Sequence, residues 1–182
     1  MPILGKEPSA WPEELFDDQP VDDQHWVALH VRPRTEKAVA RQLRSRNVPF
    51  FLPVHESRKV YQRRQVSSYS PLFPGYVFAR ADEDAKIACA GVKEVVTRLE
   101  PDDQQQLCDD LKRIHALLEA GAPLTREERL QPGMPARIVS GPLAGMSGTV
   151  VRNKSGVKFV LQVKFIQQAA SIELDGSQVE AE

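Results

Sequence analysis

The chain has 182 residues, of which 41% are hydrophobic and 27% are charged, and its formal net charge is −1. This composition is that of a soluble globular protein, and the absence of a bilayer-length apolar run argues against a membrane protein. Cys89 and Cys108 lack metal-type spacing, and the first residues lack the basic and apolar regions of a signal peptide. The cysteine spacing argues against disulfides and structural zinc. Together with the missing signal-peptide features, it predicts a cytoplasmic protein.

Charge is distributed unevenly along the chain. Residues 1–25 contain seven acids and one lysine, a net charge of −6, whereas residues 26–80 contain eleven Lys and Arg against two Glu, a net charge of +9. Unpaired like charges repel one another within a fold, so a block this basic predicts a surface that contacts phosphate. Such binding would weaken with salt, because each contact releases counterions.

Residues 1–24 predict a disordered acidic extension, since four prolines and many acids accompany few apolar side chains. Trp11 and Phe16 are exceptions that suit transient docking. A second hypothesis is that this extension folds over the basic surface and competes with DNA.

Residues 25–121 predict an α+β domain. An apolar strand at 25–31 precedes a helix from Thr35 to Arg46. There follow extended chain at 48–61, a basic hairpin or loop at 62–71, a strand at 72–81, a short helix at 82–90, a strand at 92–99 and an amphipathic helix from Gln104 to about Gly121. This order predicts an antiparallel sheet flanked by helices.

The helix predicted at 35–46 has two different sides. Val39 and Leu43 fall on the side that would face the core, and the opposite sector is cationic. Four basic residues fall within that narrow sector of the helical wheel, namely Arg34, Lys37, Arg41 and Arg44.

The composition changes again after Gly121. Residues 122–131 lack an apolar period and predict a linker. Residues 132–182 contain closely spaced glycines and prolines, and apolar residues alternate along 158–165. This pattern predicts a small five-stranded β-barrel, whose closure would remove exposed strand edges.

The stretch GPLAGMSGTVV (141–151) resembles a KOW motif. Gly141, Gly145 and Gly148 allow positive φ angles and close approach of two backbones, and a strand follows at once.

The chain as a whole resembles NusG-type transcription elongation and antitermination factors. Four stretches carry the resemblance: HWVALHVRPRTEKAVARQL from His25, LFPGYVFAR from Leu72, RLQPGMPARIVSGPLAGMSGTV from Arg129, and IELDGSQVE ending at Glu180. The family fold is an N-terminal α+β domain (NGN), a linker and a C-terminal KOW barrel. The basic segment before SPLFPGYVF favours a specialised paralogue over the housekeeping factor.

The resemblance implies a binding surface on the first domain. An apolar depression would grip the clamp of the largest RNA polymerase subunit, through His30, Phe73, Tyr76 and Phe78. Nearby cations would meet the non-template DNA strand, namely Arg32, Lys37, Arg41, Arg44, Arg63 and Arg64. Extended geometry places Phe73 and Val77 on the face opposite Tyr76 and Phe78, so part of the aromatic set is expected in the core.

For the barrel, the resemblance implies a second partner, either a small-subunit ribosomal protein or the termination factor Rho. The corresponding residues are Phe165 and Ile166, and Ile166 stands where relatives that bind these partners carry an aromatic residue. This departure leaves the identity of the partner open.

The expected function is a monomeric, non-enzymatic regulator of transcription elongation that uses no cofactor or metal. An RNA-binding ribosomal or ribosome-assembly protein is the alternative, because KOW barrels occur there too; it would bind structured RNA without polymerase. An enzyme is disfavoured, because the four histidines lie on different predicted elements and no nucleophile or metal motif accompanies them.

Overall fold

The computed structural model describes residues 7–17, 23–61, 64–127, 133–153 and 156–182. Over these ranges the chain has three α-helices and only antiparallel strand pairs, which confirms the predicted α+β class. It forms two compact units, Met1–Gln104 and Gln105–Glu182. Within the ranges given, no helix combines the length and apolar character needed to cross a membrane.

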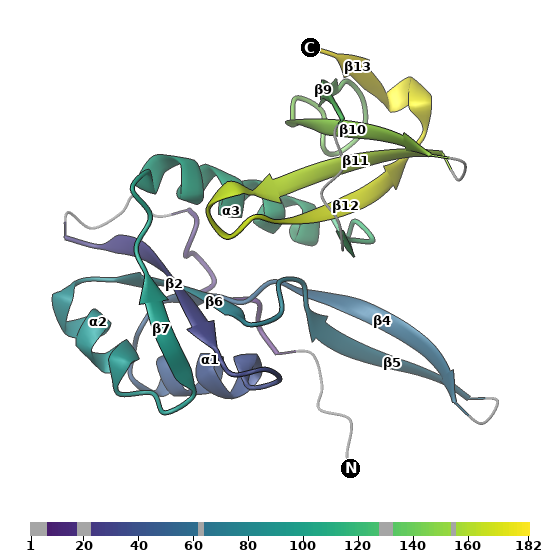
Figure 1. Cartoon of the computed structure of the whole chain (residues 1–182). Coiled ribbons are helices and arrows are strands. Elements are labelled where there is room, and N and C mark those ends of the chain that lie inside the picture. Colours follow the sequence, from purple (N-terminus) through teal and green to yellow (C-terminus); the bar gives the residue numbers. More distant parts are fainter. Residues whose placement is uncertain (1–6, 18–22, 62–63, 128–132, 154–155) are drawn as a thin grey trace. The chain divides into compact units, whose positions relative to one another are not determined.

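The first unit is built on a five-stranded sheet of order β1-β3-β6-β2-β7 (Figure 1). The strands are β1 (Ala10–Trp11), β2 (His25–Val31), β3 (Phe50–Phe51), β6 (Tyr76–Ala81) and β7 (Val95–Leu99). The two most apolar strands, β2 and β6, are neighbours in this sheet, and their register pairs His30 with Tyr76. An apolar strand gains most when it is covered on both faces, so these two lie toward the centre.

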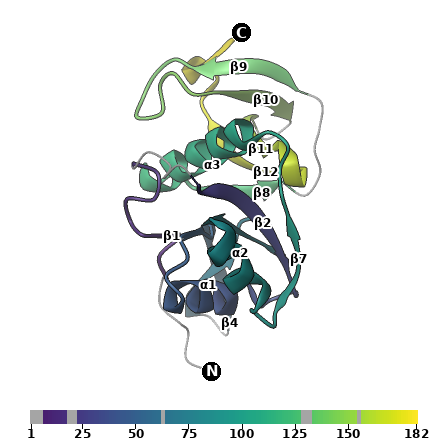
Figure 2. The same ribbon diagram turned by 90° about the vertical axis from the view of Figure 1, so that its left-hand side faces the viewer.

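Two helices, α1 (Glu36–Ser45) and α2 (Glu83–Ala90), cover one face of this sheet (Figures 1 and 2). Val39 and Leu43 of α1 pack into a buried cluster with strand residues such as Leu29 and Val77. The apolar side predicted for the first helix is therefore confirmed. Thr35 holds the N-cap position without a side-chain cap, since its hydroxyl donates to the Arg32 carbonyl instead.

A long hairpin of β4 (Val54–Tyr61) and β5 (Arg64–Pro71) projects from the sheet of the first unit (Figure 1). Its register runs from Val54 opposite Pro71 to Tyr61 opposite Arg64. The sequence predicted extended chain followed by a hairpin or loop, and the structure joins both segments into one hairpin. Arg63 lies outside the described residues.

Residues 7–17, here called the N-terminal segment, are ordered against the first unit, which differs from the predicted disordered extension. β1 pairs with β3 as an edge strand. Leu15 is buried, and the Phe16 ring stacks on Trp26 at 5.5 Å and meets Phe51 edge-on at 4.9 Å. These few apolar side chains bury enough surface to fix a segment whose overall composition is that of a tail.

The second unit contains a six-stranded antiparallel sheet of order β13-β9-β10-β11-β12-β8. Its strands are β8 (Thr125–Glu127), β9 (Met134–Ile138), β10 (Ser147–Asn153), β11 (Gly156–Val163), β12 (Gln168–Leu174) and β13 (Val179–Ala181). Figure 2 shows β9 and β10 side by side. Within the described ranges the edge strands β8 and β13 do not pair, so the sheet is open where a closed five-stranded barrel was expected.

The third helix, α3 (Gln104–Glu119), starts at the boundary between the units. Asp110 of α3 accepts a hydrogen bond from the Lys164 backbone N–H at 3.0 Å, and Arg113 donates to the Ser147 carbonyl at 3.3 Å. These bonds tie α3 to the second sheet, whereas the sequence placed the domain boundary after residue 121. The segment predicted as a linker, 122–131, contributes β8 to the same sheet.

Candidate functional site

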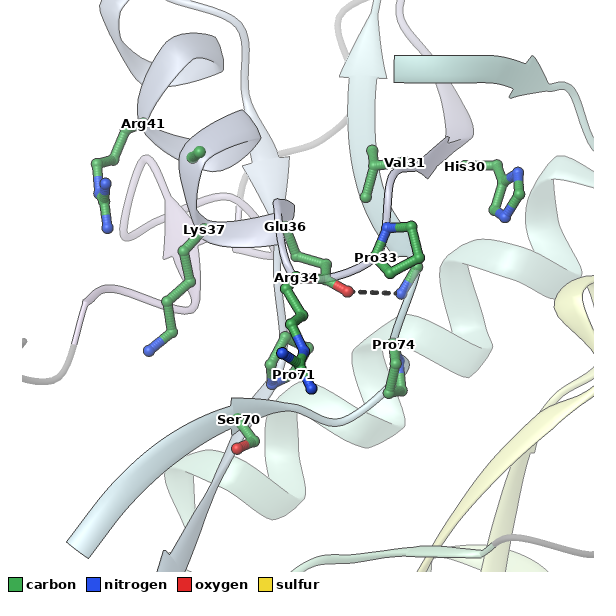
Figure 3. Close-up of a pocket in the computed structure, with 12 residues that line it drawn as sticks. His30, Val31, Pro33, Arg34, Glu36, Lys37, Arg41, Ser70, Pro71 and Pro74 are labelled. Atoms are coloured by element: carbon green, nitrogen blue, oxygen red, sulfur yellow. Dashed lines mark hydrogen bonds between the residues drawn. The ribbon is translucent and has the colours of Figure 1, made fainter. Parts of the chain in front are cut away.

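A cleft of about 680 Å³ lies between the start of α1 and the turn before β6 (Figure 3). Three cations and three prolines line it, together with His30, Glu36 and Gly75. The cations are Arg34, Lys37 and Arg41, and the prolines are Pro33, Pro71 and Pro74. The cleft therefore combines an apolar wall with a positively charged rim, a combination suited to a partner that is part apolar and part anionic.

Gly75 fixes the turn that forms one wall of the cleft. Its φ of +85° is a left-handed conformation that favours glycine. The Gly75 carbonyl accepts from the Val31 N–H at 2.8 Å, and the Gly75 N–H donates to Glu36 Oε1 at 2.8 Å (Figure 3). The turn is thus attached to both β2 and α1.

Glu36 is a site residue that sequence reasoning missed. It is only 4% exposed, although it stands in the first turn of a helix with a cationic side. The sequence offered one signal for it, because Glu36 is the only acidic residue in residues 26–55, a segment that is otherwise rich in Lys and Arg. The bond to Gly75 satisfies part of its hydrogen-bonding capacity, as a buried carboxylate requires.

The four residues predicted for polymerase contact separate into two pairs. His30 and Tyr76 are opposite each other on β2 and β6, with ring centroids 5.4 Å apart, and both are partly exposed. Phe73 and Phe78 are 1% and 0% exposed, and their rings meet edge-on at 6.2 Å.

Simple strand alternation does not hold through this stretch. Because the positive φ of Gly75 ends the extended run, β6 begins only at Tyr76, and Phe73 reaches the ring of Phe78 instead of lying on the opposite face. The predicted contact is corrected for Phe73 and Phe78, which are both buried in this structure, whereas Tyr76 is partly exposed.

The predicted cations of the first domain cluster at α1. Arg32, Arg41 and Arg44 are exposed and Lys37 is partly exposed, and the three that belong to α1 lie on the side of the helix away from buried Val39. Figure 3 shows Lys37 and Arg41 projecting from α1 and Arg34 from the segment before it. Of the two hairpin arginines, Arg64 is the first residue of β5.

Arg41 already has an anionic partner. Its Nη2 donates to Glu7 Oε1 at 2.8 Å and its Nε donates to the same oxygen at 3.1 Å. The hydrogen bond that Arg41 donates to the Glu7 carboxylate raises the pKa of Arg41, so the guanidinium remains charged. Sequence reasoning had only the general hypothesis of an acidic extension over a basic surface, and the structure supplies this contact.

Two different structural requirements explain why glycine stands at positions 141, 145 and 148. Gly141 and Gly145 adopt φ angles of +86° and +91°. Gly148 has an ordinary φ, but a Cβ there would lie 2.6 Å from Cζ of Phe159. Positive φ and close approach are the two properties predicted from the sequence.

The predicted partner residues of the second unit lie in a short 3₁₀ turn, Lys164–Ile166, at the end of β11. Phe165 is partly exposed and Ile166 is buried. The alternation of apolar residues is confirmed for buried Phe159, Leu161 and Val163, and it ends where β11 ends.

The first unit, with helices packed on one face of an antiparallel sheet and a basic α1, defines an α+β protein with a candidate anion-binding cleft. A family model described as transcription termination factor nusG matches residues 24–118, which is more than half of the 182-residue chain. The chain belongs to the NusG family.

One of the similar solved structures supports the same class of fold. A Thermotoga maritima NusG structure, concerned with its domain interaction, aligns with a TM-score of 0.51 and 19% identity over 87% of this chain and 97% of that one. A crystal structure of the MjSpt4:Spt5 complex in conformation B aligns at 18% identity over 86% of this chain and 95% of that one, with a TM-score of 0.28. The first likeness concerns the fold, and the second is too low to add to it. No curated protein matches the chain.

Proposed function

We propose that this protein is a transcription elongation regulator that binds RNA polymerase at the clamp of its largest subunit, next to the non-template DNA strand. It promotes processive elongation and antitermination. The observation that carries the proposal is the cleft of the first unit. Partly exposed His30 lines this cleft together with the cations Lys37 and Arg41 of α1. Membership of the NusG family supports it.

Tyr76 and His30 form the accessible part of the polymerase contact. Their rings are amphipathic and lie next to each other, so they can bury apolar area while keeping a polar edge hydrated. Phe73 and Phe78 pack against each other in the interior and hold the turn and β6 in place. A small binding site reaches useful affinity when such an aromatic anchor is well supported.

The cations of α1 contact the DNA backbone. Arg32, Lys37, Arg41 and Arg44 supply the helix side of this surface, and Arg63 and Arg64 add further phosphate contacts. No element among the described residues is a helix-turn-helix or zinc finger, and backbone contacts alone carry little sequence information. Binding is therefore expected to be weakly sequence-dependent and strongly salt-dependent.

Regulation follows from differential binding. A protein that binds the closed clamp more tightly than the open clamp shifts polymerase toward the closed, processive state. The second unit acts as a KOW-type module that recruits a small-subunit ribosomal protein or Rho through the turn Lys164–Ile166, where Phe165 is partly exposed and Ile166 is buried. Tethering to the first unit raises the effective concentration of that partner at the polymerase.

The test is a pull-down of RNA polymerase with Tyr76→Ala, combined with a pause assay. Loss of an aromatic anchor should weaken binding by about tenfold or more and restore pausing. Ile87→Ala is the matched control, because Ile87 is an exposed apolar residue on α2. Wild-type binding by a folded Tyr76→Ala variant would remove the proposed contact. Tight binding of structured RNA without polymerase would instead favour a ribosomal role.

A further inference from the structure

The N-terminal segment is held in one position by contacts along its length. β1 pairs with β3, and the Leu52 N–H donates to the Ser9 carbonyl at 2.6 Å. Farther along, Leu15 is buried and its carbonyl accepts from Arg80 Nη1 at 3.0 Å. A segment anchored at both places has little freedom to move its remaining side chains away from the sheet edge.

This anchoring brings Glu7 to the rim of the cleft. Glu7 lies three residues before Ala10 of β1, and its carboxylate meets the Arg41 guanidinium, 34 residues away in sequence. Their side chains are 26% and 52% exposed. An ion pair this exposed contributes little by itself. Because β1 tethers Glu7, however, the carboxylate is present at Arg41 at a high effective concentration.

Arg41 uses the same donors for a carboxylate as it would for a phosphate. A guanidinium binds either anion through a planar fork of N–H groups, and here Nε and Nη2 both donate to Glu7. Lys37 and Arg34 lie on the same cleft without being part of this pair. The position of the Glu7 carboxylate therefore marks a place where an anion fits.

We propose that Arg41, with Lys37 beside it, is a subsite for a backbone phosphate of nucleic acid, and that Glu7 occupies it in the free protein as an intramolecular competitor. The inference rests on the proposed contact of α1 with nucleic acid. Its consequence is selectivity: bulk nucleic acid must displace Glu7, so binding away from polymerase is suppressed. On polymerase, the high local concentration of the DNA strand overcomes the competitor.

The test is a double-mutant cycle on the full chain, with a fluorescein-labelled oligothymidylate as probe and fluorescence anisotropy at low salt as readout. Glu7→Gln should tighten binding about two- to fivefold, the range expected when one exposed ion pair no longer has to be broken. Arg41→Gln should weaken binding. In the Arg41→Gln background, Glu7→Gln should have no further effect, because the competitor has lost its target.

Salt dependence provides a second readout. When Glu7 is replaced by Gln, forming the Arg41–phosphate contact releases counterions without breaking a protein ion pair. The slope of log affinity against log salt should then steepen by up to about 0.7, the value for one phosphate of a single strand. The matched control is Glu14→Gln, which makes the same charge change at an exposed position of the same segment.

The outcomes separate this inference from the function on which it rests. Unchanged affinity in Glu7→Gln with weaker binding in Arg41→Gln would overturn the competitor and leave the α1 contact intact. Equal tightening by Glu7→Gln and Glu14→Gln would also overturn it, since the effect would be one of general charge. No effect of either Arg41→Gln or Glu7→Gln would contradict the proposed nucleic-acid contact itself.

Discussion

Cys89 shows at the residue scale how burial alone changes the chemistry of a side chain. It is fully buried in the core of the first unit, on α2. Desolvation raises the pKa of its thiol from 9.0 to about 11, against smaller opposing effects of Arg98 and Arg46. A thiol in this state is a poor nucleophile, so Cys89 contributes packing and no reactivity.

The raised pKa predicts a loss of stability in alkali. Below pH 9 the thiol is protonated in both the folded and the unfolded chain, and its contribution is fully present. As the pH rises from 9 to about 11, the unfolded chain ionises while the folded chain resists, so the stability falls. The free energy of unfolding of wild type, relative to Cys89→Ala, should drop by about 2 kcal/mol across this range.

Urea unfolding at a series of pH values measures this difference. Subtracting the Cys89→Ala curve removes the contributions of lysines and tyrosines that titrate in the same range. Parallel curves for the two proteins would show that the folded thiol titrates normally.

Site residues differ in how far the sequence could predict them. The cations of α1 were predictable, because their position on one side follows from helical period and neighbouring sequence alone. The roles of Glu36 and Glu7 were not predictable, because each depends on a hydrogen-bond partner that lies far away in sequence. The partner of Glu36 is Gly75, and the partner of Glu7 is Arg41. Phe73 was misplaced, because one positive φ at Gly75 cancels strand alternation.

At the element scale, long elements with their own period were predictable and short ones were not. The strand at 25–31 and the helices at 35–46 and 82–90 were predicted to within about a residue. β1 and β8 have two and three residues, and they exist only because β3 and β12 offer an edge to pair with. The same dependence on partners explains why the alternation along 158–165 could not distinguish the open sheet from the closed barrel that was expected.

The N-terminal segment is the element whose stability contribution is easiest to test. Leu15 is almost completely buried and is one of the few apolar side chains of this segment. Leu15→Ala removes this apolar contact and should lower the free energy of unfolding by about 2–4 kcal/mol. Glu14→Gln, an exposed neighbour, should have no measurable effect.

Urea unfolding followed by tryptophan fluorescence is suitable, because Trp26 stacks on Phe16 of the same segment. If Leu15→Ala unfolds at the wild-type urea concentration, the segment contributes nothing to the fold and its contacts are incidental.

At the scale of the whole molecule, the proposed function uses two units that carry different features. The first carries the cleft, the aromatic pair and the cationic helix, and the second carries the glycine-rich turn and the Phe165 turn. The net charge of −1 hides an uneven distribution, because the net −6 of residues 1–25 and the net −4 of residues 81–182 together offset the net +9 of residues 26–80. An acidic segment placed beside a basic surface moderates its charge without removing it.

The most direct test of the central claim is site-specific photo-cross-linking in an assembled elongation complex. A photoreactive phenylalanine analogue is introduced at position 76, at position 44 or, as a control, at position 87 on α2. Position 76 should cross-link to the largest polymerase subunit and position 44 to the non-template DNA strand, while position 87 gives neither product. Cross-links from position 87 with none from positions 76 and 44 would contradict the account.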